Sequence, residues 1–368
     1  MSVKFWDLEP EYSEIRNEII QAVDEAFKSG WLILGERVIN FEDAWAKYSG
    51  VAHGVGVNSG TDALFLALKA LGIGPGDEVI TVANTAIPTV SAIESTGAKT
   101  RFVDTEPDTY LMDPNKIEAI IGPNTRCILP VHLYGQCVNM EAINFIAKKH
   151  ELPVLEDCAQ SHGAVQNGFT AGSMGTASAF SFYPTKVLGA YGDAGMVLSG
   201  SDKLTEKVRR LRAYGISDNY ISDEHGYNSR LDEVQAAILS VKLPLLEGWI
   251  KERQRLAEVY SKHLSDLSLR LPVVAKGNQH VYYAYVVRHP KRMRIIEKLR
   301  SEDIQVNITY PHPISLMAGY QHLGYKVGDL PETERACKEV FSLPLYPGLT
   351  AENQEKVCIA LKSITNDL

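Results

Sequence analysis

The first two thirds of the chain alternate between short apolar runs and longer segments with helical spacing. Two amphipathic helical patterns come first, at 11–28 and 36–48. Apolar and β-branched runs then recur between 53 and 200, and helical patterns separate most of them. The runs read HGVGVN, DEVITVA, TRFVDT, RCILPVHL, LPVLEDCA, ASAFSFY and AGMVLSG. This alternation predicts an α/β fold with a mostly parallel, mixed sheet flanked by helices. In such sheets, ligands bind beyond the carboxyl ends of the strands.

The remaining third has a different rhythm. A long helical pattern runs from about 229 to about 265 and is interrupted at Pro244. An alternating run at 280–288 predicts a strand, and helical patterns follow at 290–300, 331–340 and 351–364. We therefore expect a large domain over 1–249, which includes the N-terminal helical segment, and a smaller α+β domain over 250–368.

Composition excludes several classes of protein. Hydrophobic residues make up 45% and charged residues 22%, as in ordinary globular proteins. The net charge of −8, without a basic tract, argues against nucleic acid as a partner. There is no apolar leader core and no run long enough to span a membrane, so we expect a cytoplasmic protein. The five cysteines lack CxxC spacing and the histidines lack paired-ligand spacing, so we expect neither disulfides nor a metal.

Three segments at predicted strand ends carry candidate chemistry. The first is NSGTDAL, where Ser59, Gly60 and Thr61 join a strand to a helix. Free N–H groups and the helix dipole make such a turn a phosphate site. The alternative is a simple N-cap, in which a hydroxyl satisfies the first helical turn.

The second segment is VLEDCAQSHGA, in which Asp157 follows a buried apolar pair. A carboxylate at this edge of a parallel sheet can hold a cation or a protonated ring nitrogen, although it could instead cap the next turn.

The third segment is SFYPTK, which ends in Lys186 after a run that predicts a core strand. A half-buried lysine needs a salt bridge, a bound phosphate or a covalent bond, and a desolvated lysine is a good nucleophile toward carbonyls. The simpler alternative is a surface lysine paired with Asp193.

These segments together predict pyridoxal 5′-phosphate as the cofactor. It needs a lysine for a Schiff base, an acid on the pyridine nitrogen and a phosphate cup. Lys186, Asp157 and the turn at 59–61 supply them. A fourth segment, GYNSRLDEVQAAIL, places Asn228 before an amphipathic helix, which by itself indicates only a helix start.

At this point the sequence resembles the DegT-type nucleotide-sugar aminotransferases, which have fold type I of the pyridoxal phosphate enzymes. The shared blocks cover almost the whole chain and include NSGTDAL, GIGPGDEVIT, ILPVHLYGQ, LEDCAQSHGA, SFYPTK, GAYGDAGM and YNSRLDEVQAAIL. The resemblance implies a covalent bond from Lys186 to the cofactor, after which Lys186 moves the proton of the 1,3-shift. It also implies that Asp157 holds the pyridinium nitrogen and that Gln160 contacts the ring hydroxyl oxygen.

The same resemblance implies how the phosphate is bound. Ser59, Gly60, Thr61 and Ser181 would contact it within one chain. Asn228 would reach the phosphate of the neighbouring subunit's cofactor, which implies a homodimer with shared active sites.

The chain also departs from the family pattern. Ala86 occupies the position where a bulky residue often stacks on the cofactor ring. The segment that begins Tyr310-Pro311-His312 ends in Ser315, where many members have a histidine, and Tyr283 stands where a histidine is common. We expect Tyr183, Tyr310 and His312 to face the substrate.

The predicted function is transfer of an amino group, expected to come from glutamate, to a 3- or 4-keto-6-deoxy sugar of a nucleotide-linked hexose. Two alternatives share the fold. One is a cofactor-binding regulator without turnover, which loss of Lys186 or Asp157 would favour. The other is a sugar dehydratase, in which histidine replaces the lysine.

Overall fold

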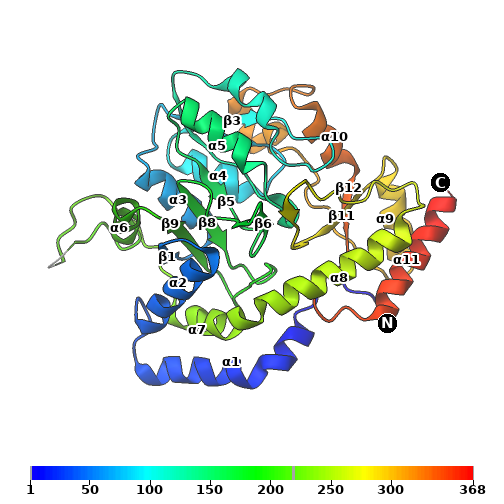
Figure 1. Ribbon diagram of the computed structural model, residues 1–368, viewed down its shortest axis with the longest axis horizontal. Helices are drawn as coiled ribbons and strands as arrows, with labels where there is room; N and C mark the ends of the chain where they lie inside the picture. Colours follow the sequence, from blue (N-terminus) through cyan, green and yellow to red (C-terminus); the bar gives the residue numbers. More distant parts are fainter. Residues whose placement is uncertain (1, 218–219, 368) are drawn as a thin grey trace.

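The computed structural model describes residues 2–217 and 220–367, and its helices surround a central sheet (Figure 1). The helices are α1 (Glu9–Ser29), α2 (Glu36–Ser49), α3 (Gly60–Ala70), α4 (Ile87–Ser95), α5 (Met140–Lys149), α6 (Asp202–Leu211), α7 (Glu233–Lys242), α8 (Leu246–Leu264), α9 (Arg292–Ser301), α10 (Pro331–Glu339) and α11 (Ala351–Asn366). The strands are β1 (His53–Val57), β2 (Glu78–Val82), β3 (Lys99–Val103), β4 (Thr125–Ile128), β5 (Leu155–Asp157), β6 (Val165–Gln166), β7 (Phe169–Thr170), β8 (Ala177–Ser181), β9 (Gly195–Ser199), β10 (Asn278–Gln279), β11 (Tyr285–Arg288) and β12 (Val340–Leu343).

The central sheet consists of two hydrogen-bonded groups of strands. One has the order β1-β9-β8-β5 and the other has the order β3-β2-β4. Parallel bridges from Ile128 to Val154 and from Val131 to Asp157 join β4 to β5, so the groups form one continuous sheet. Strand β9 runs antiparallel to both of its neighbours, and the other pairs are parallel. The predicted mostly parallel, mixed sheet is therefore confirmed, and each apolar run predicted between 53 and 200 contributes a strand.

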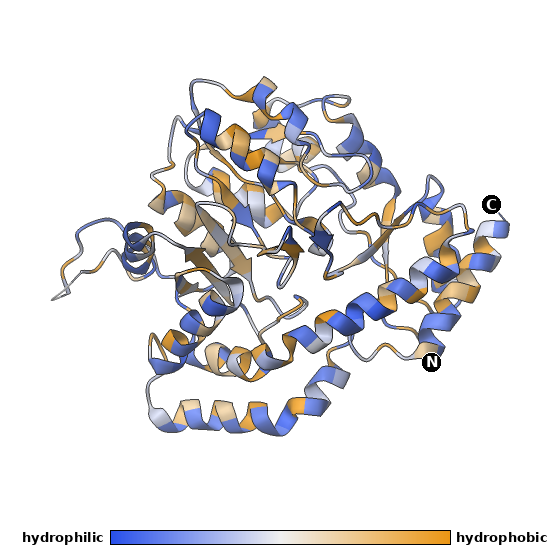
Figure 2. Cartoon of the chain, viewed as in Figure 1, coloured by the Kyte–Doolittle hydropathy of each residue, from blue (hydrophilic) through white to orange (hydrophobic). Residues whose placement is uncertain are grey.

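Burial explains why these runs read as nearly continuous apolar segments. Strand β9 is buried along its full length, and β1, β2 and β8 are buried at four positions each. Strands covered on both faces have no solvated side that would require polar residues. Figure 2 shows the result, with hydrophobic colour in the interior strands and mixed colour along α1 and α8.

The C-terminal part has a core of its own. Helices α8, α9 and α11 cover the antiparallel pair β11–β12, with Tyr260, Tyr285 and Phe341 buried among them. Val3 joins this core through a parallel bridge to Ile304. Helix α8 passes through residue 250 without a break. The division into domains at 249 and 250 stays a prediction.

Two predicted elements begin later than expected. The strand predicted at 280–288 starts at Tyr285, because Tyr282 has a left-handed backbone (φ 49°) that interrupts an extended run. The helix predicted from about 229 starts at Glu233. The Ser229 N–H donates to the Arg212 carbonyl, which holds this segment in a non-helical conformation. None of the helices in the described ranges is long and apolar enough to cross a membrane.

Candidate active site

Strands β5 and β8 place Asp157 and Ser181 at the same edge of the sheet. The two strands pair in parallel with Asp157 opposite Ala179, so their carboxyl ends lie side by side. Asp157 is only 4% exposed. Its carboxylate accepts hydrogen bonds from the Thr89 hydroxyl (2.8 Å) and the Ala159 N–H (3.1 Å). Burial raises the pKa of Asp157, and the hydrogen bonds and the charge of Lys186 only partly offset this effect. A buried carboxylate in this state favours a cationic partner.

Lys186 lies on a tight loop directly after β8. The Lys186 N–H donates to the Tyr183 carbonyl (2.8 Å), and the Ala190 N–H donates to the Phe182 carbonyl (2.7 Å), which closes the loop. The side chain is half-buried, and its Nζ lies 4.8 Å from the centroid of the Tyr283 ring. Within the described ranges Lys186 forms no ion pair with Asp193, so the surface-lysine alternative is not what the structure has.

The turn at 59–61 is both a helix cap and an open anion site. Ser59 caps α3, and its Oγ accepts the Asp62 N–H (3.1 Å), so the N-cap interpretation holds. A Cβ on Gly60 would lie 2.4 Å from the Ser181 Cβ, which means that the turn and the end of β8 touch. Ser59, Thr61 and Ser181 are all half-buried. The end of β8 therefore lies against a helix N-terminus that solvent can reach.

Gln160 connects the sheet edge to the C-terminal part of the chain. Its Oε1 accepts the Tyr134 N–H (2.8 Å), and its Nε2 donates to the Tyr310 hydroxyl (2.8 Å). The Tyr134 hydroxyl donates to the Thr309 carbonyl. The predicted substrate residue Tyr310 is thereby fixed beside the predicted cofactor residue Gln160.

The other predicted residues are held less firmly. Ala86 is the half-buried residue that precedes α4. Tyr183 is 51% exposed on the Lys186 loop, and His312 is exposed in the segment that follows Tyr310. Asn228 is also exposed, but its neighbour Ser229 accepts the Asn58 N–H on its Oγ (3.1 Å). The segment before α7 thus contacts the phosphate-type turn within the same chain.

Two contacts in the site escaped the sequence analysis. Thr89, in the first turn of α4, bonds Asp157, and its hydroxyl also lies 2.9 Å from the hydroxyl of Thr85, which precedes the helix. Tyr283 was noted only as a departure from the family, yet its ring contacts Lys186. Burial alone would raise the pKa of Tyr283, but the positive charge of Lys186 and a hydrogen bond with Thr185 outweigh it and hold that pKa below its usual value.

A buried cluster next to Asp157 has the donor types of a metal site but is already satisfied. His132, Glu156 and Cys158 lie within 4.8 Å of one another. The Glu156 carboxylate accepts the N–H groups of Gly172 (2.9 Å) and Met174 (2.8 Å) and a bond from the His132 ring (2.8 Å). The other ring nitrogen of His132 accepts the Val138 N–H (3.2 Å), so His132 and Glu156 already have partners and support the local fold.

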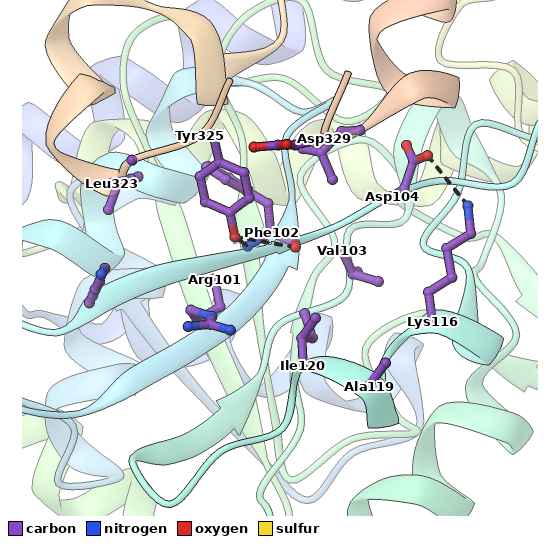
Figure 3. A pocket seen from close by; sticks show the side chains of 13 residues that line it. Arg101, Phe102, Val103, Asp104, Lys116, Ala119, Ile120, Leu323, Tyr325 and Asp329 are labelled. Carbon is purple, nitrogen blue, oxygen red and sulfur yellow. Dashed lines mark hydrogen bonds and ion pairs between the residues drawn. The ribbon is translucent and has the colours of Figure 1, made fainter. Parts of the chain in front are cut away.

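A cavity of about 460 Å³ lies far along the sheet, beside edge strand β3 (Figure 3). It contains none of the predicted site residues. Lys116 pairs with Asp104 (3.3 Å), and the Tyr325 hydroxyl accepts the Phe102 N–H (2.8 Å), as the dashed lines show. Because these polar groups satisfy one another, the cavity is a weaker candidate than the strand ends.

The residues at the strand ends fit pyridoxal phosphate. Asp157 is a buried carboxylate that could bind a protonated ring nitrogen, and Lys186 has an amine that could form the covalent bond. The N-terminus of α3, with Gly60 packed against Ser181, could bind the phosphate. These features come from separate elements of the fold, so their convergence is not explained by local structure alone.

Comparisons with known proteins agree with this geometry. Residues 13–362 match the model of the DegT/DnrJ/EryC1/StrS aminotransferase family. The chain is 50% identical to a dTDP-3-amino-3,4,6-trideoxy-alpha-D-glucose transaminase of Micromonospora megalomicea subsp. nigra, with 100% of each protein covered. It is 46% identical to a "Pleiotropic regulatory protein" of Geobacillus stearothermophilus, with 97% of each covered. The crystal structure of S. venezuelae DesV in complex with a ketimine intermediate superimposes with a TM-score of 0.98 at 40% identity, covering 100% of this chain and 99% of that one.

These matches confirm the predicted fold type, the predicted cofactor pyridoxal 5′-phosphate and the predicted class of enzyme, a sugar aminotransferase. On the length and the level of the similarity, the chain belongs to the DegT/DnrJ/EryC1/StrS aminotransferase family.

Proposed function

We propose that this protein transfers an amino group from an amino acid, expected to be glutamate, to a keto group on a nucleotide-linked 3- or 4-keto-6-deoxy hexose. The observation that carries the proposal is the convergence of Lys186 and Asp157 at adjacent parallel strand ends, beside the N-terminus of α3. The name of the Micromonospora relative, a transaminase of a dTDP-linked deoxysugar, supports the substrate class.

The cofactor supplies an electron sink when bound, and this chain's residues decide where protons reside. Asp157 keeps the pyridine nitrogen protonated, because a buried carboxylate without a cation is unfavourable. Lys186 would hold the cofactor covalently through its amine, and that amine would be the group that moves the proton at the reacting carbon. The ring of Tyr283 lies 4.8 Å from the Lys186 Nζ, and this cation–π contact helps to orient the Lys186 side chain.

The phosphate is held by the α3 N-terminus. Ser59, Gly60, Thr61 and Ser181 would bind the phosphate within one chain, and the close approach of Gly60 to Ser181 would keep this site narrow. Gln160 would contact the ring hydroxyl oxygen, and Ala86 would adjoin the ring without the stacking surface of a bulkier residue.

The substrate lies on the side formed by Tyr183, Tyr310 and His312. Tyr310 is the firmest of the three, since Gln160 donates to its hydroxyl. Tyr183 and His312 are exposed on loops and can adjust to a sugar nucleotide.

A homodimer would complete each site through Asn228 of the neighbouring chain. Large apolar side chains are exposed on α1, on α2 and between them, which is unusual for a surface that faces water. They are Ile20, Phe27, Trp31, Leu32, Ile33 and Ile39. A second copy of the chain would cover them, in the cytoplasmic setting that the sequence favours.

A regulator without turnover is the second candidate, because one relative carries a regulatory name. Lys186 and Asp157 are both present, which favours an enzyme. The lysine at 186 also argues against the dehydratase alternative.

The test is a product analysis. The purified protein, converted to its pyridoxamine form, is incubated with a panel of 3-keto and 4-keto sugar nucleotides, and products are identified by mass and NMR. An aminated sugar from one panel member supports the proposal and names the ring carbon. A protein that binds cofactor but aminates no sugar in the panel, with glutamate or other amino donors, would favour the regulator.

A further inference from the structure

The Lys186 loop rests on a buried charge that the chemistry described above does not use. Lys242, the last residue of α7, is 1% exposed. Its ammonium lies 2.5 Å from a Glu11 carboxylate oxygen on α1 and donates a hydrogen bond to the Gly189 carbonyl. Gly189 is three residues beyond Lys186. A buried lysine is costly unless it is paired, so its position calls for an explanation.

Aromatic rings enclose the same ammonium. Its Nζ lies 4.9 Å from the centroid of the Tyr191 ring and 5.6 Å from that of Trp249. The Tyr12 ring of α1 meets Tyr191 edge-on at 5.9 Å. Burial lowers the pKa of Lys242, and the adjacent Glu11 carboxylate raises it. The pair is thus enclosed by side chains from α1, α7, α8 and the loop.

The loop itself has little freedom above this charge. A Cβ on Gly189 would lie 2.5 Å from the Pro184 carbonyl oxygen, so the backbone at Gly189 packs directly against the backbone at Pro184. Gln235, also on α7, accepts the Tyr191 N–H (3.0 Å) and donates to the Tyr191 carbonyl (3.3 Å). Helix α7 therefore holds Gly189 in the loop and Tyr191 just after it, through two side chains that are seven residues apart and lie on the same face of the helix.

We propose that Lys242 and Glu11 form a buried brace that positions Lys186 for its reaction. The ammonium fixes the Gly189 carbonyl, and Glu11 makes this possible by neutralising the charge from α1. A loop of nine residues, 182–190, would otherwise leave the Lys186 amine free to move by more than the fraction of an ångström that proton transfer tolerates. Lys242 is a positioning residue and does not touch the cofactor or the substrate. This inference rests on Lys186 as the reactive lysine.

A double-mutant cycle can separate the effect of the Glu11–Lys242 pair on stability from its effect on the position of Lys186. Removing one partner leaves the other charge buried and unpaired, whereas removing both relieves that penalty. The Gly189 carbonyl loses its donor whenever Lys242 is replaced, alone or together with Glu11. Stability should therefore recover in the double variant while the position of Lys186 does not.

The experiment compares Lys242→Met, Glu11→Leu and the double variant Glu11→Leu/Lys242→Met, as holoenzymes. Lys28→Met is the matched control, since Lys28 is an exposed lysine of α1 paired with Asp24. We expect Lys242→Met to lower the unfolding temperature by roughly 5 °C or more and the double variant to regain most of that loss. In Lys242→Met and in the double variant, kcat should fall about 10-fold or more, with little change in KM for the amino donor.

Two readouts do not depend on turnover. Hydrogen exchange over 187–192 should accelerate in Lys242→Met and in the double variant but not in Lys28→Met. The midpoint pH of the absorbance change of the bound cofactor should shift in the same two variants. A double variant with restored stability, wild-type exchange and a wild-type midpoint would overturn the positioning role. If the cofactor proved to be attached to another lysine, the proposed function would fail, although the stability cycle between Glu11 and Lys242 would remain.

Discussion

The two sides of the candidate site are built in different ways. The cofactor side consists of strand ends and buried hydrogen bonds, with Asp157 held by Thr89 and Ala159 and with Gln160 held by Tyr134. The substrate side consists of loops, on which Tyr183 and His312 are exposed. Tyr310 bonds to the cofactor side through its side chain, whereas Tyr183 bonds to it only through its backbone. The sheet thus fixes the chemistry, and the loops are left to determine which sugar is used.

The largest effect is expected on the cofactor side, from Lys186→Ala. The variant should lose transamination by about 10³-fold or more, because both the covalent attachment and the proton carrier are removed. Turnover and the absorbance of bound cofactor measure this. Lys203→Ala, an exposed lysine on α6, is the control and should behave as wild type. An active Lys186→Ala variant would contradict the claim that the cofactor side determines the chemistry.

Asp157→Asn should have the next largest effect. The amide cannot keep the ring nitrogen protonated, so turnover should fall by roughly 10²-fold while most cofactor binding remains. Equilibrium binding and single-turnover rates separate the two quantities. A rate near that of wild type would show that Asp157 is not the partner of the ring.

The third prediction asks whether Asn228 contributes to the active site of the neighbouring chain. Lys186→Ala and Asn228→Trp homodimers should each be inactive or nearly so, and mixing them should restore at most about half of the activity per heterodimer, since one site then holds no altered residue. Native mass spectrometry checks that subunits have exchanged. Confirmed exchange without recovery would place Asn228 in its own chain's site.

The fourth prediction probes the link between the two sides. Tyr310→Phe removes the hydroxyl that accepts from Gln160, so activity should fall by about 3- to 10-fold, the range of a single hydrogen bond. Steady-state kinetics with the keto sugar measure it. His312→Ala, on the exposed part of the same segment, is the comparison and should change KM more than kcat. Equal behaviour of the two variants would mean that Tyr310 belongs to the loop side alone.

The smallest effect concerns the cofactor-free protein. The pKa of Asp157 is raised by burial, so the stability that its protonated form contributes is present below its unfolded pKa and is lost as pH rises through its folded pKa. Cofactor-free Asp157→Asn should not show that loss, so its free energy of unfolding at pH 7 should exceed that of the wild-type protein by up to about 1 kcal/mol. Denaturant melts from pH 4 to pH 8 test this. Curves that stay parallel across that range would contradict it.

The sequence predicted the cofactor side because its signals are local. Lys186 and Asp157 each follow an apolar run, and parallel strands must end at the same edge. The contacts that complete the site join distant positions. Thr89 reaches Asp157 across 68 residues and Tyr134 reaches Thr309 across 175, and no spacing rule connects such pairs. The Glu11–Lys242 pair is hidden for the same reason, since either residue alone reads as a surface charge on an amphipathic helix.

The most direct test of the central claim is the site of cofactor attachment. The purified holoenzyme is reduced with borohydride, digested and mapped by mass spectrometry. We predict a single cofactor-labelled peptide that contains Lys186, and no label after prior conversion to the pyridoxamine form with an amino donor. A label on any other lysine, or a label that the donor does not prevent, would contradict the account.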